Sequence, residues 1–395
     1  MKRSIKNKET DQYVGKRVLI LEGYARQCLA LARGFRKNGC HVSVLCNSKL
    51  DLAYASRVFD EKILGVCDLE RVKDTEEQIR QLLKTGKYDI VVPCVDFSAA
   101  ILSENKIEFS QYAYVASNDL AVYQIAGDKE KTMAVCMKYG IPAPMTLLQV
   151  SSIEDVAKSG ITFPIVTKPK TGYGAIGFKK LSSMEEVCEL FRDREQEIPL
   201  YVFQEYIPQT ALQYECAMFI DNENQVKTAT VFSKNRWFPI EGGSSTLNIT
   251  VDRPDIVKSC TALLQQIGWR GPADIDLIDD PRDGKAKIME INPRVSGSVK
   301  IVFESGADQS LQILQMAMGQ PVSDQLTYDV GQRLRFTQSD LLWFIKSPNR
   351  FKAEPSWFSI RKTKDHTFYW DDPLPWFVFA VSALLKLRKE MKKRK

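Results

Sequence analysis

The chain has 395 residues, which is enough for two or three packed units rather than a single core. Its composition, 44% hydrophobic and 26% charged, is typical of a soluble globular protein. The net charge of +6 resides in residues 386–395, which hold seven Lys or Arg and one Glu. Because the rest of the chain balances to zero, the sequence argues against a basic face that binds nucleic acid.

The cysteine and histidine content excludes two common kinds of site. Nine cysteines are scattered singly without a CxxC pair, and His41 and His366 are the two histidines. This pattern argues against a zinc site and against a disulfide framework. Residues 1–12 contain no apolar segment, so we expect no secretory signal and reduced thiols in a cytoplasmic protein.

Residues 1–117 alternate short apolar runs with a helical pattern. We predict strands at residues 16–21, 41–46, 88–95 and 112–117, and an amphipathic helix over residues 25–39. Strands that alternate with helices form a parallel sheet with covered faces. The turn after the first strand has one glycine, Gly23, and lacks the GxGxxG sequence that a dinucleotide requires. The pattern therefore indicates a Rossmann-like α/β domain without evidence of a dinucleotide cofactor.

A glycine-rich segment follows in TKPKTGYGAIGFKK, where Gly172, Gly174 and Gly177 spell GxGxxG. The flanking residues read as strands, whereas the dinucleotide motif must open a helix. A glycine loop between strands can instead fold over phosphates with its backbone N–H groups, and Lys168 would direct a cation at the same phosphates. The alternative is a flexible hairpin with a surface lysine, and the segment alone does not decide between the two.

Residues 273–292 predict a hairpin around the turn PRDG, and this hairpin carries acidic residues. Glu290 and Asn292 are two apart on one strand, so they share a face, and the turn sets Asp276 close to Glu290. A divalent cation would convert the repulsion between these carboxylates into ligation, and Mg²⁺ prefers oxygen ligands. The alternative is a solvated sheet face. Arg294, just past the strand, adds a planar cation suited to carboxylate or phosphate.

Together these segments resemble the ATP-grasp superfamily, in its carbamoyl phosphate synthetase and biotin carboxylase-like branch. The most specific stretch is IMEINPRVSGS from Ile288, followed by VTKPKTGYGAIG, GDKEKT at Gly127 and QEYI at Gln204. The resemblance implies a Rossmann-like domain over residues 1–117 and a two-lobed ATP-grasp domain over residues 118–322. Residues 140–207 would form its mobile lid, and residues 323–395 would be a C-terminal extension with an apolar helix and a basic tail.

The resemblance also implies a nucleotide site and a metal site. The implied ATP-binding residues are Lys129, Lys168, Gly172, Gly174, Gly177, Gln204, Glu205, Ile207 and Glu215. The lysines would contact the phosphates, residues 204–207 would meet adenine largely through the backbone, and Glu215 would take the ribose hydroxyls. The implied ligands of one or two Mg²⁺ ions, with Mn²⁺ as an alternative, are Asp276, Glu290 and Asn292. Lys168 and Arg294 would be catalytic, and Arg294 would stabilise the acyl phosphate or orient the carboxylate.

The segment RWFPIEGGSST lies where the resemblance implies substrate-facing residues. We expect substrate contacts from Arg236, Gly242, Gly243 and Ser244, against the alternative of a surface turn. The apolar run 374–385 is too short to span a bilayer, and we favour a helix docked on the protein. The alternative is a helix that lies, with its basic tail, on an anionic membrane surface.

The sequence analysis favours an ATP-dependent, ADP-forming ligase that activates a carboxylate as an acyl phosphate and transfers it to an amine or thiol. Its substrates would be small molecules, and a homodimer is left open. Two alternatives remain at this stage. One is a carbamoyl phosphate synthetase-like enzyme that uses bicarbonate, although the chain shows nothing resembling a glutaminase or a biotin carrier. The other is a non-catalytic ATP-binding regulator.

Overall fold

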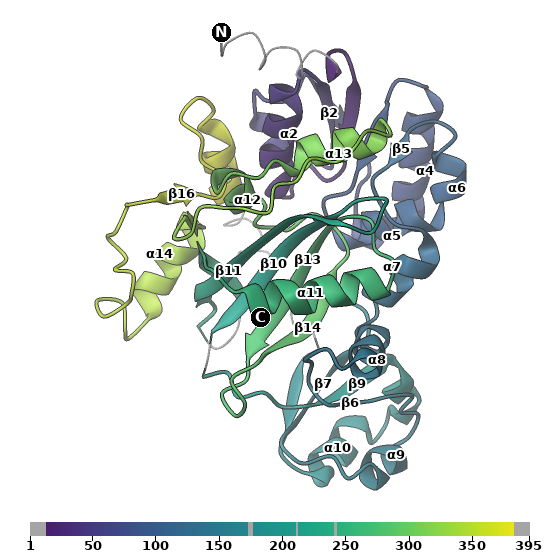
Figure 1. The fold of residues 1–395 in the computed structure, drawn as a ribbon, viewed down its shortest axis with the longest axis vertical. Helices are drawn as coiled ribbons and strands as arrows, with labels where there is room; N and C mark the ends of the chain where they lie inside the picture. Colours follow the sequence, from purple (N-terminus) through teal and green to yellow (C-terminus); the bar gives the residue numbers. More distant parts are fainter. Residues whose placement is uncertain (1–12, 173–176, 211, 241–242, 383–395) are drawn as a thin grey trace.

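The computed structural model describes residues 13–172, 177–210, 212–240 and 243–382. These residues form three β-sheets, of five, seven and four strands. In Figure 1 the five-stranded sheet lies above the long central sheet, and the four-stranded sheet with its helices forms a separate lobe below it. The mixed α/β architecture is the fold class that the sequence predicted.

The first sheet is parallel throughout, with the strand order β3-β2-β1-β4-β5. Its strands are β1 (Arg17–Ile20), β2 (His41–Cys46), β3 (Glu61–Leu64), β4 (Ile90–Val92) and β5 (Tyr114–Val115). Four of these lie within the apolar runs predicted to be strands. The edge strand β3 was not predicted, because Glu61 and Lys62 interrupt its apolar pattern and its side chains stay partly exposed.

Helices connect these strands and pack on both the sheet and the second domain. They are α2 (Gln27–Lys37), α3 (Leu52–Ala55), η2 (Leu69–Arg71), α4 (Val72–Lys84), α5 (Asp96–Glu104), α6 (Lys106–Phe109) and α7 (Leu120–Ala126). Helix α2 approaches α13 (Gln309–Ala317) closely at Gly34, where a Cβ atom would collide with Ser310. The glycine therefore permits the close contact that joins the first domain to the second.

The order of the parallel strands creates a topological switch between β1 and β4. The chain leaves β1 toward β2 and β3 and then returns to β4 on the other side. Loops at the carboxyl ends of two such strands separate and leave a crevice that is the usual binding site in this kind of sheet. Here the loops are residues 21–26 and 93–95, which places Arg26 and Asp96 at this edge.

The second sheet has the order β14-β13-β10-β11-β12-β15-β16 and is antiparallel except for the last pair. Its strands are β10 (Gln213–Ile220), β11 (Val226–Phe238), β12 (Ser244–Thr250), β13 (Gly271–Asp279), β14 (Ala286–Asn292), β15 (Arg333–Arg335) and β16 (Thr363–Asp365). The predicted hairpin of residues 273–292 is confirmed as β13 and β14. The last two strands show that the segment predicted as an extension completes this sheet.

Alternate side chains of the central sheet enter two different cores. Cys216 and Met218 of β10 pack with the helix α11 (Pro254–Gln266) and with α8 (Lys129–Tyr139), whereas Ala217 and Phe219 pack with α2 and α12 (Lys300–Glu304). This alternation is the period of two that a strand imposes on its side chains. Because the second face adjoins the first domain, polar residues on it lie between the two domains.

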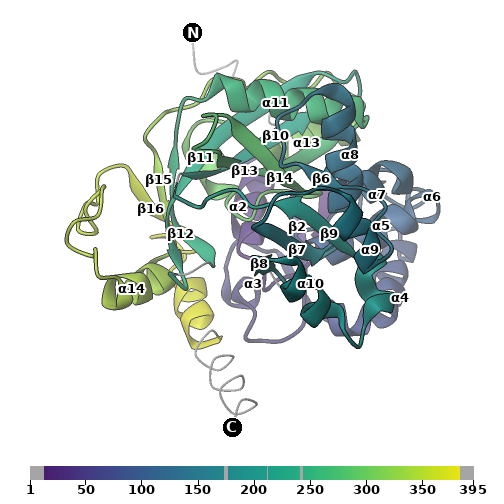
Figure 2. The same ribbon diagram turned by 90° about the horizontal axis from the view of Figure 1, so that it is seen from below.

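The third sheet, β6-β9-β7-β8, is antiparallel and forms the small lobe seen from below in Figure 2. Its elements are β6 (Thr146–Leu147), α9 (Ile153–Lys158), β7 (Ile165–Pro169), β8 (Lys179–Leu181), α10 (Met184–Phe191), η3 (Glu195–Leu200) and β9 (Tyr201–Glu205). Ile165 and Phe203 pack with Phe191 in the core of this lobe. The opposite face of the sheet carries Val166, Lys168 and Gln204, whose register places them on one side.

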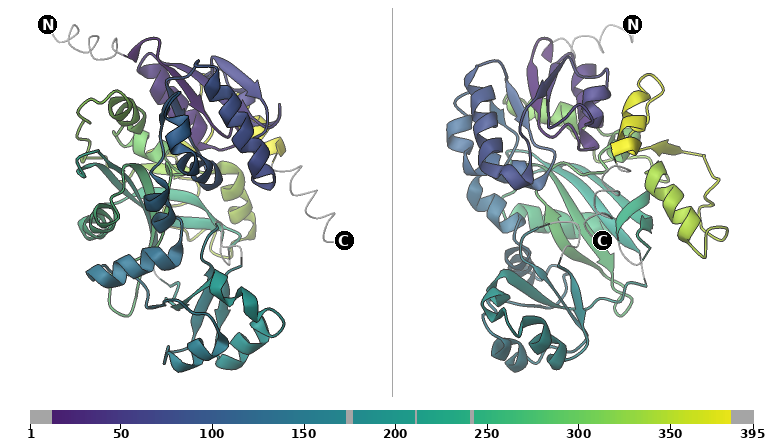
Figure 3. Two further views of the ribbon diagram at one scale, coloured as in Figure 1. Left: turned by 90° about the vertical axis from the view of Figure 1, so that its right-hand side faces the viewer. Right: turned by 180° about the vertical axis from the view of Figure 1, so that it is seen from behind.

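The C-terminal segment packs against both large domains, as both views in Figure 3 show for its yellow helix. Besides β15 and β16 it contains α14 (Thr337–Lys346) and a helix over residues 374–382. In this last helix Ser382 donates a hydrogen bond to the Leu50 carbonyl, and the Phe379 ring lies 5.4 Å from that of Phe336. The described part of the helix is therefore docked, as the sequence favoured. The basic residues 386–395 lie outside the described residues.

None of the helices in the described ranges has the length and apolar character needed to cross a bilayer.

Glu22, in the loop after β1, is a fully buried carboxyl group. Its oxygens accept hydrogen bonds from the Cys94 N–H at 2.8 Å and the Cys67 thiol at 3.2 Å. Burial nevertheless raises the pKa of Glu22 to about 7. The native state therefore binds a proton on the Glu22 carboxyl more tightly than the unfolded chain does. The folding stability that this proton contributes is lost as the pH rises through about 7.

We predict that Glu22→Gln stabilises the protein at alkaline pH. The amide fills the same space but cannot ionise. The variant therefore avoids a loss of folding stability that reaches about 3 kcal/mol when the pH is high enough to ionise the wild-type carboxyl. Denaturant unfolding at about pH 5 and about pH 8 should show a difference between variant and wild type that grows with pH. A difference independent of pH would contradict the buried-carboxyl assignment.

Candidate active site

A row of acidic side chains crosses three neighbouring strands of the central sheet. Glu215 on β10 lies opposite Asp276 on β13, and Asp276 lies opposite Glu290 on β14. Paired residues point to the same face, so all three carboxylates face the first domain. The structure thus brings Asp276 and Glu290 together as the hairpin predicted.

A bulge adjusts the hairpin next to this row. The register shifts after Asp276, so that Leu277 lies opposite Ile288 and Met289 has no direct partner. Ile288 and Ile291 are consequently the core residues on β14, whereas simple alternation would place Met289 there. Because the bulge adds one residue to β14, Glu290 and Asn292 lie on the polar face with Asp276, as the predicted metal site requires.

Lys234 on β11 neutralises two carboxylates of the row. Its ammonium lies 3.1 Å from Glu215 and also forms an ion pair with Asp276. Burial alone would lower the pKa of Lys234, but the charges of Asp276 and Glu215 outweigh burial and raise it. Burial would likewise raise the pKa of Asp276, yet Lys234 and the Asn292 amide hold it below its ordinary value. The row is therefore a charged network rather than a set of neutral acids.

Arg294 ties the acidic row to the first domain. Its Nε lies 2.9 Å from Asp96, at the start of α5, and its terminal nitrogen lies 3.6 Å from Asp274. The other terminal nitrogen donates to Asn292 Oδ1 at 3.1 Å. Burial, reinforced by Glu215 and Asp276, raises the pKa of Asp274 well above its usual range. Arg294 is thus fixed beside the row by contacts on three sides.

Two lysines face the row from the opposite direction. Lys129, the first residue of α8, lies 3.2 Å from Glu290 and donates at 2.8 Å to the Gly172 carbonyl. Asp128 caps the same helix by accepting from the N–H groups of Glu130 and Lys131. Lys168 on β7 lies within electrostatic range of Glu290 and Asp276, and burial lowers its pKa. One cation from α8 and one from the small lobe therefore lie close to the acids of the central sheet.

The glycine segment continues directly from β7. Gly172 has a φ of +115° and Gly177 a φ of +78°, which are conformations that side chains rarely adopt. A Cβ atom on Gly177 would also lie 2.9 Å from Pro169 Cδ. Gly174 lies outside the described residues. The described ends of the segment therefore require glycine, while the predicted phosphate contacts of the loop stay a prediction.

The residues predicted to meet adenine lie at the end of β9. Gln204 is fully buried, with its amide nitrogen 2.9 Å from Thr146 Oγ1 and its amide oxygen lacking a partner within the described residues. Glu205 directs its carboxylate to Arg282 at 2.7 Å and Lys287 at 3.1 Å, and Ile207 is buried. The Glu205 side chain is therefore occupied, which agrees with a contact through the backbone rather than through the carboxylate.

The predicted magnesium ligands supply suitable oxygen atoms, although lysines pair with them here. Asp276 pairs with Lys234, Glu290 with Lys129, and the Asn292 oxygen accepts from Arg294. Within the part of the chain that the structure describes, no three acids, histidines or cysteines converge on one point as a ready metal cluster. Two carboxylates and an amide that share one face fit the donor chemistry of Mg²⁺, which commonly takes one or two carboxylates and completes its shell with phosphate.

Comparison with known proteins identifies the domain that carries this site. Residues 126–298 match the family described as the ATP-grasp domain. The chain contains an ATP-grasp domain. The matched range holds both lysines, the glycine segment and the complete acidic row. Biotin carboxylase from Campylobacter jejuni shares the fold, with a TM-score of 0.68 and 15% identity, over 82% of this chain and 75% of that structure.

Two curated relatives also match. A D-aspartate ligase of Enterococcus faecium is 26% identical over 271 residues, covering 63% of this chain and 63% of the relative. A D-alanine–D-alanine ligase of Francisella tularensis is 24% identical over 176 residues, covering 42% of this chain and 57% of the relative. The chain thus covers less than two thirds of the length of either relative.

Arg236, predicted to contact substrate, lies on the other face of the central sheet of the ATP-grasp domain. Lys234 is opposite Asn248, but an intervening bulge sets Arg236 opposite Leu247. Arg236 is 3% exposed and binds Asp340 of α14 through Nε at 2.8 Å and a terminal nitrogen at 2.9 Å. The structure therefore contradicts the substrate contact and assigns Arg236 to the docking of α14.

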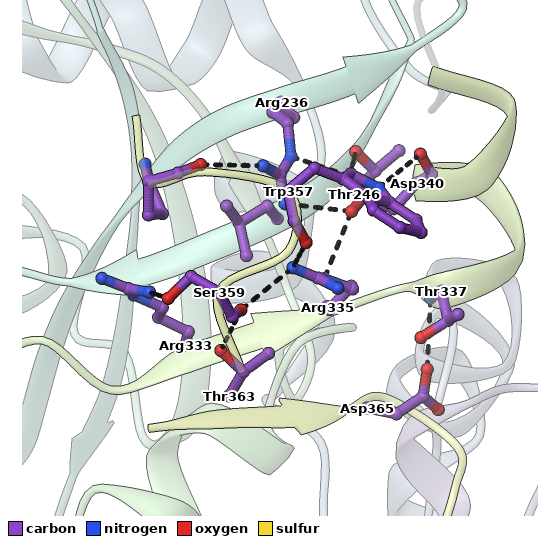
Figure 4. Close-up of polar contacts among 12 residues, drawn as sticks. Arg236, Thr246, Arg333, Arg335, Thr337, Asp340, Trp357, Ser359, Thr363 and Asp365 are labelled. Atoms are coloured by element: carbon purple, nitrogen blue, oxygen red, sulfur yellow. Dashed lines mark hydrogen bonds and ion pairs between the residues drawn. The ribbon is translucent and has the colours of Figure 1, made fainter. Parts of the chain in front are cut away.

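Figure 4 shows Arg236 and Arg335 directed at the same carboxylate of Asp340. Arg335 Nε lies 3.2 Å from Asp340, and its terminal nitrogen donates to the Trp357 carbonyl at 2.7 Å. Thr246 also donates to Asp340 at 2.8 Å. This cluster joins the central sheet to the C-terminal segment and is separated from the acidic row by the sheet.

The remaining predicted substrate residues lie at the hairpin between β11 and β12. A Cβ atom on Gly243 would collide with the backbone at Phe238, so glycine has a structural reason there. Ser244 is exposed at the start of β12, and Gly242 lies outside the described residues. Substrate contact by Gly243 and Ser244 stays a prediction.

Sequence reasoning did not identify Lys234, Asp96 or Asp274 as site residues. The sequence does indicate the position of Lys234, because it lies two residues past the core residue Phe232 on the long strand β11 and therefore on the same face. Asp274 could have been found from the alternation in ADIDLID, which sets it on the face of Asp276. Asp96 gives no signal, since it comes from a different domain.

We predict that Asp340→Asn destabilises the protein by about 3–5 kcal/mol, because it leaves the buried cations Arg236 and Arg335 without their counter-ion. Denaturant unfolding measures this loss. Asp324 supplies the control, because its side chain is 71% exposed and its partner Lys227 also pairs with Asp221, so Asp324→Asn should change stability by less than about 0.5 kcal/mol. Equal effects of the two substitutions would contradict the structural role.

Proposed function

We propose that the protein is an ATP-dependent, ADP-forming carboxylate–amine ligase that works through an acyl phosphate. The observation that carries this proposal is the opposition of Lys168 and Lys129 to the row Asp276–Glu290 with Arg294 beside it, within the matched ATP-grasp domain. The curated relatives are named as ligases that act on amino acids, which supports the same class of reaction.

The arrangement of charges suits phosphoryl transfer, where catalysis depends mainly on positioning and charge neutralisation. Lys168 and Lys129 would hold the phosphates of ATP, and the glycine segment would cover them. Asp276, Glu290 and Asn292 would hold Mg²⁺, which neutralises phosphate charge when bound. Glu215 would accept hydrogen bonds from the ribose hydroxyls. The same carboxylate pairs with Lys234, so it would have to make both contacts.

Arg294 would orient the carboxylate substrate. Its guanidinium is buried and fixed by Asp96 and Asn292, so it presents a cation without a large rearrangement. A carboxylate oxygen would attack the γ-phosphorus, ADP would leave, and an amine would then displace phosphate from the acyl carbon. The amine loses one proton in that step, so the products are an amide or peptide-like bond, ADP and phosphate.

Two alternatives are distinguished by their substrates. A carbamoyl phosphate synthetase-like enzyme would release ADP with bicarbonate as the acid, and a regulator would bind ATP without turnover. The Lys129–Glu290 ion pair, and the hydrogen bonds that link Arg294 to Asn292 and Asn292 to Asp276, favour catalysis over a regulator. Use of a thiol as nucleophile, the metal count, a homodimer and contact of residues 386–395 with an anionic membrane stay predictions.

The proposal is tested by trapping the acyl phosphate. Incubation with ATP, Mg²⁺, hydroxylamine and a panel of amino-acid and other carboxylates should yield a hydroxamate with equimolar ADP. Bicarbonate-driven ADP release would support the first alternative, and tight ATP binding without ADP in any combination would overturn the ligase proposal.

Glu290→Gln should lower kcat/KM by roughly 100-fold or more, because it removes an anionic ligand of the Mg²⁺ that would position and neutralise the transferring phosphoryl group. Glu154→Gln, in an exposed helical ion pair with Lys158, is the matched control and should retain wild-type turnover. Wild-type kinetics in the Glu290 variant, with normal thermal unfolding, would remove Glu290 from the mechanism.

A further inference from the structure

Arg26 occupies the topological switch point of the first domain. It is the last residue of the loop after β1 and immediately precedes α2, whose first turn contains no acidic residue. The N-terminal end of a helix carries a partial positive charge and attracts anions. Two independent sources of positive potential, the helix end and the guanidinium, therefore meet at this edge.

The Arg26 guanidinium makes no ion pair or hydrogen bond with any residue in the described ranges. The guanidinium instead lies over the Phe336 ring, with its carbon 4.6 Å from the ring centroid. Burial lowers the pKa of Arg26, while Glu215 and Asp365 oppose this effect and Arg294 adds to it. The side chain is thus a desolvated cation within electrostatic range of the acidic row.

The acids nearest to Arg26 are committed to other donors. Glu215 pairs with Lys234. Asp365 accepts from the N–H groups of Thr367 and Phe368 through one oxygen, both at 2.8 Å, and from Thr337 through the other at 3.1 Å. Neither carboxylate is therefore free to pair with Arg26 in place of a ligand.

His366 is a second unsatisfied group at the same place. It is 4% exposed, neither ring nitrogen has a hydrogen-bond partner within the described chain, and its ring lies 6.3 Å from that of Phe336. Burial lowers the pKa of His366 far below its usual range, and the charges of Arg26 and Lys300 lower it further. The ring is neutral at physiological pH and keeps one N–H to donate.

We propose that Arg26 and His366 form a binding site for a substrate carboxylate that is not phosphorylated. The inference rests on the proposed ligase function, because it assigns the second anionic group of that reaction. A carboxylate would satisfy the planar fork of Arg26, the His366 N–H and the positive end of α2 together. A partly buried cation and a buried imidazole without partners are costly unless such a ligand completes them.

The carboxylate can belong to either substrate. It can be the second acid group of a dicarboxylate whose other carboxylate is activated, or the carboxylate of an amino acid that supplies the amine. A carboxylate from either substrate would make the same contacts with Arg26. Matched pairs of substrates, with and without that carboxylate, are therefore needed to tell which substrate carries it.

The experiment uses the full chain as wild type, Arg26→Gln, Arg26→Lys and His366→Phe. Arg36→Gln is the control, because Arg36 lies on the same helix but is 43% exposed and pairs with Asp60. The acid arm compares D-aspartate with D-asparagine, which lacks the β-carboxylate, and with β-alanine, which lacks the α-carboxylate, using hydroxylamine as nucleophile; the analogue that is still activated is the counterpart without a second carboxylate. The amine arm compares alanine with ethylamine at a fixed acid. Both arms report KM and kcat, and calorimetry measures direct binding of D-aspartate and alanine.

We expect Arg26→Gln to raise KM roughly 30-fold or more for the carboxylate-bearing member of one pair, as expected for truncation of a buried charge pair. Its neutral counterpart should change by less than about twofold, since that substrate never made the contact. His366→Phe should give a smaller increase and Arg26→Lys a partial one, while Arg36→Gln stays at wild type. The pair that responds identifies which substrate carries the carboxylate.

Equal effects of Arg26→Gln on both members of each pair, or none on either, would overturn the site. If wild type forms no product with any acid and amine, the ligase proposal fails separately. Calorimetry then decides the site: binding of D-aspartate or alanine that weakens in Arg26→Gln supports it, and absence of binding to wild type overturns it.

Discussion

The site depends on the neutralisation of largely buried charges that lie between two domains. Glu215, Asp276 and Glu290 lie side by side on three hydrogen-bonded strands, and such a row is unfavourable unless cations accompany it. Lys234 enters from the same sheet, Lys129 from the start of α8, and Arg294 joins the row to Asp96 of the first domain. Each cation comes from a different element, so the packing of those elements and the electrostatics of the site require one another. A change that moved either lobe would leave buried carboxylates without partners.

Local patterns account for most of what the sequence could predict. Alternation in ADIDLID and AKIMEIN, with a short turn between them, sets both the register of β13 with β14 and the pairing of Asp276 with Glu290. The cap at Asp128 and the left-handed Gly140 define α8 in the same way, since each acts within one turn of helix. The hairpin prediction succeeded because strand period, like helix capping, is decided by neighbouring residues.

The failures arise where one residue or one distant contact changes the outcome. The bulge after Lys234 turns Arg236 to the other face of the sheet, and nothing in FSKNRWF announces that extra residue. The pairing of Arg294 with Asp96 spans almost two hundred positions of the chain, and the C-terminal segment joins the central sheet through two three-residue strands. Such short strands leave no periodic signal, so the sequence predicted a C-terminal extension where β15 and β16 complete the sheet.

The distribution of unpaired cations points to where ligands enter. In the described chain Lys129, Lys234 and Arg294 each contact a carboxylate, whereas Lys168 and Arg26 have no ion-pair partner. Lys168 lies toward the Glu290 end of the acidic row and Arg26 toward the Glu215 end. Burial lowers the pKa of both groups, so each would be stabilised by an anion that the protein itself does not provide. A nucleotide phosphate at the first and a substrate carboxylate at the second would complete the charge balance, and the reacting groups would then meet between them, beside Arg294.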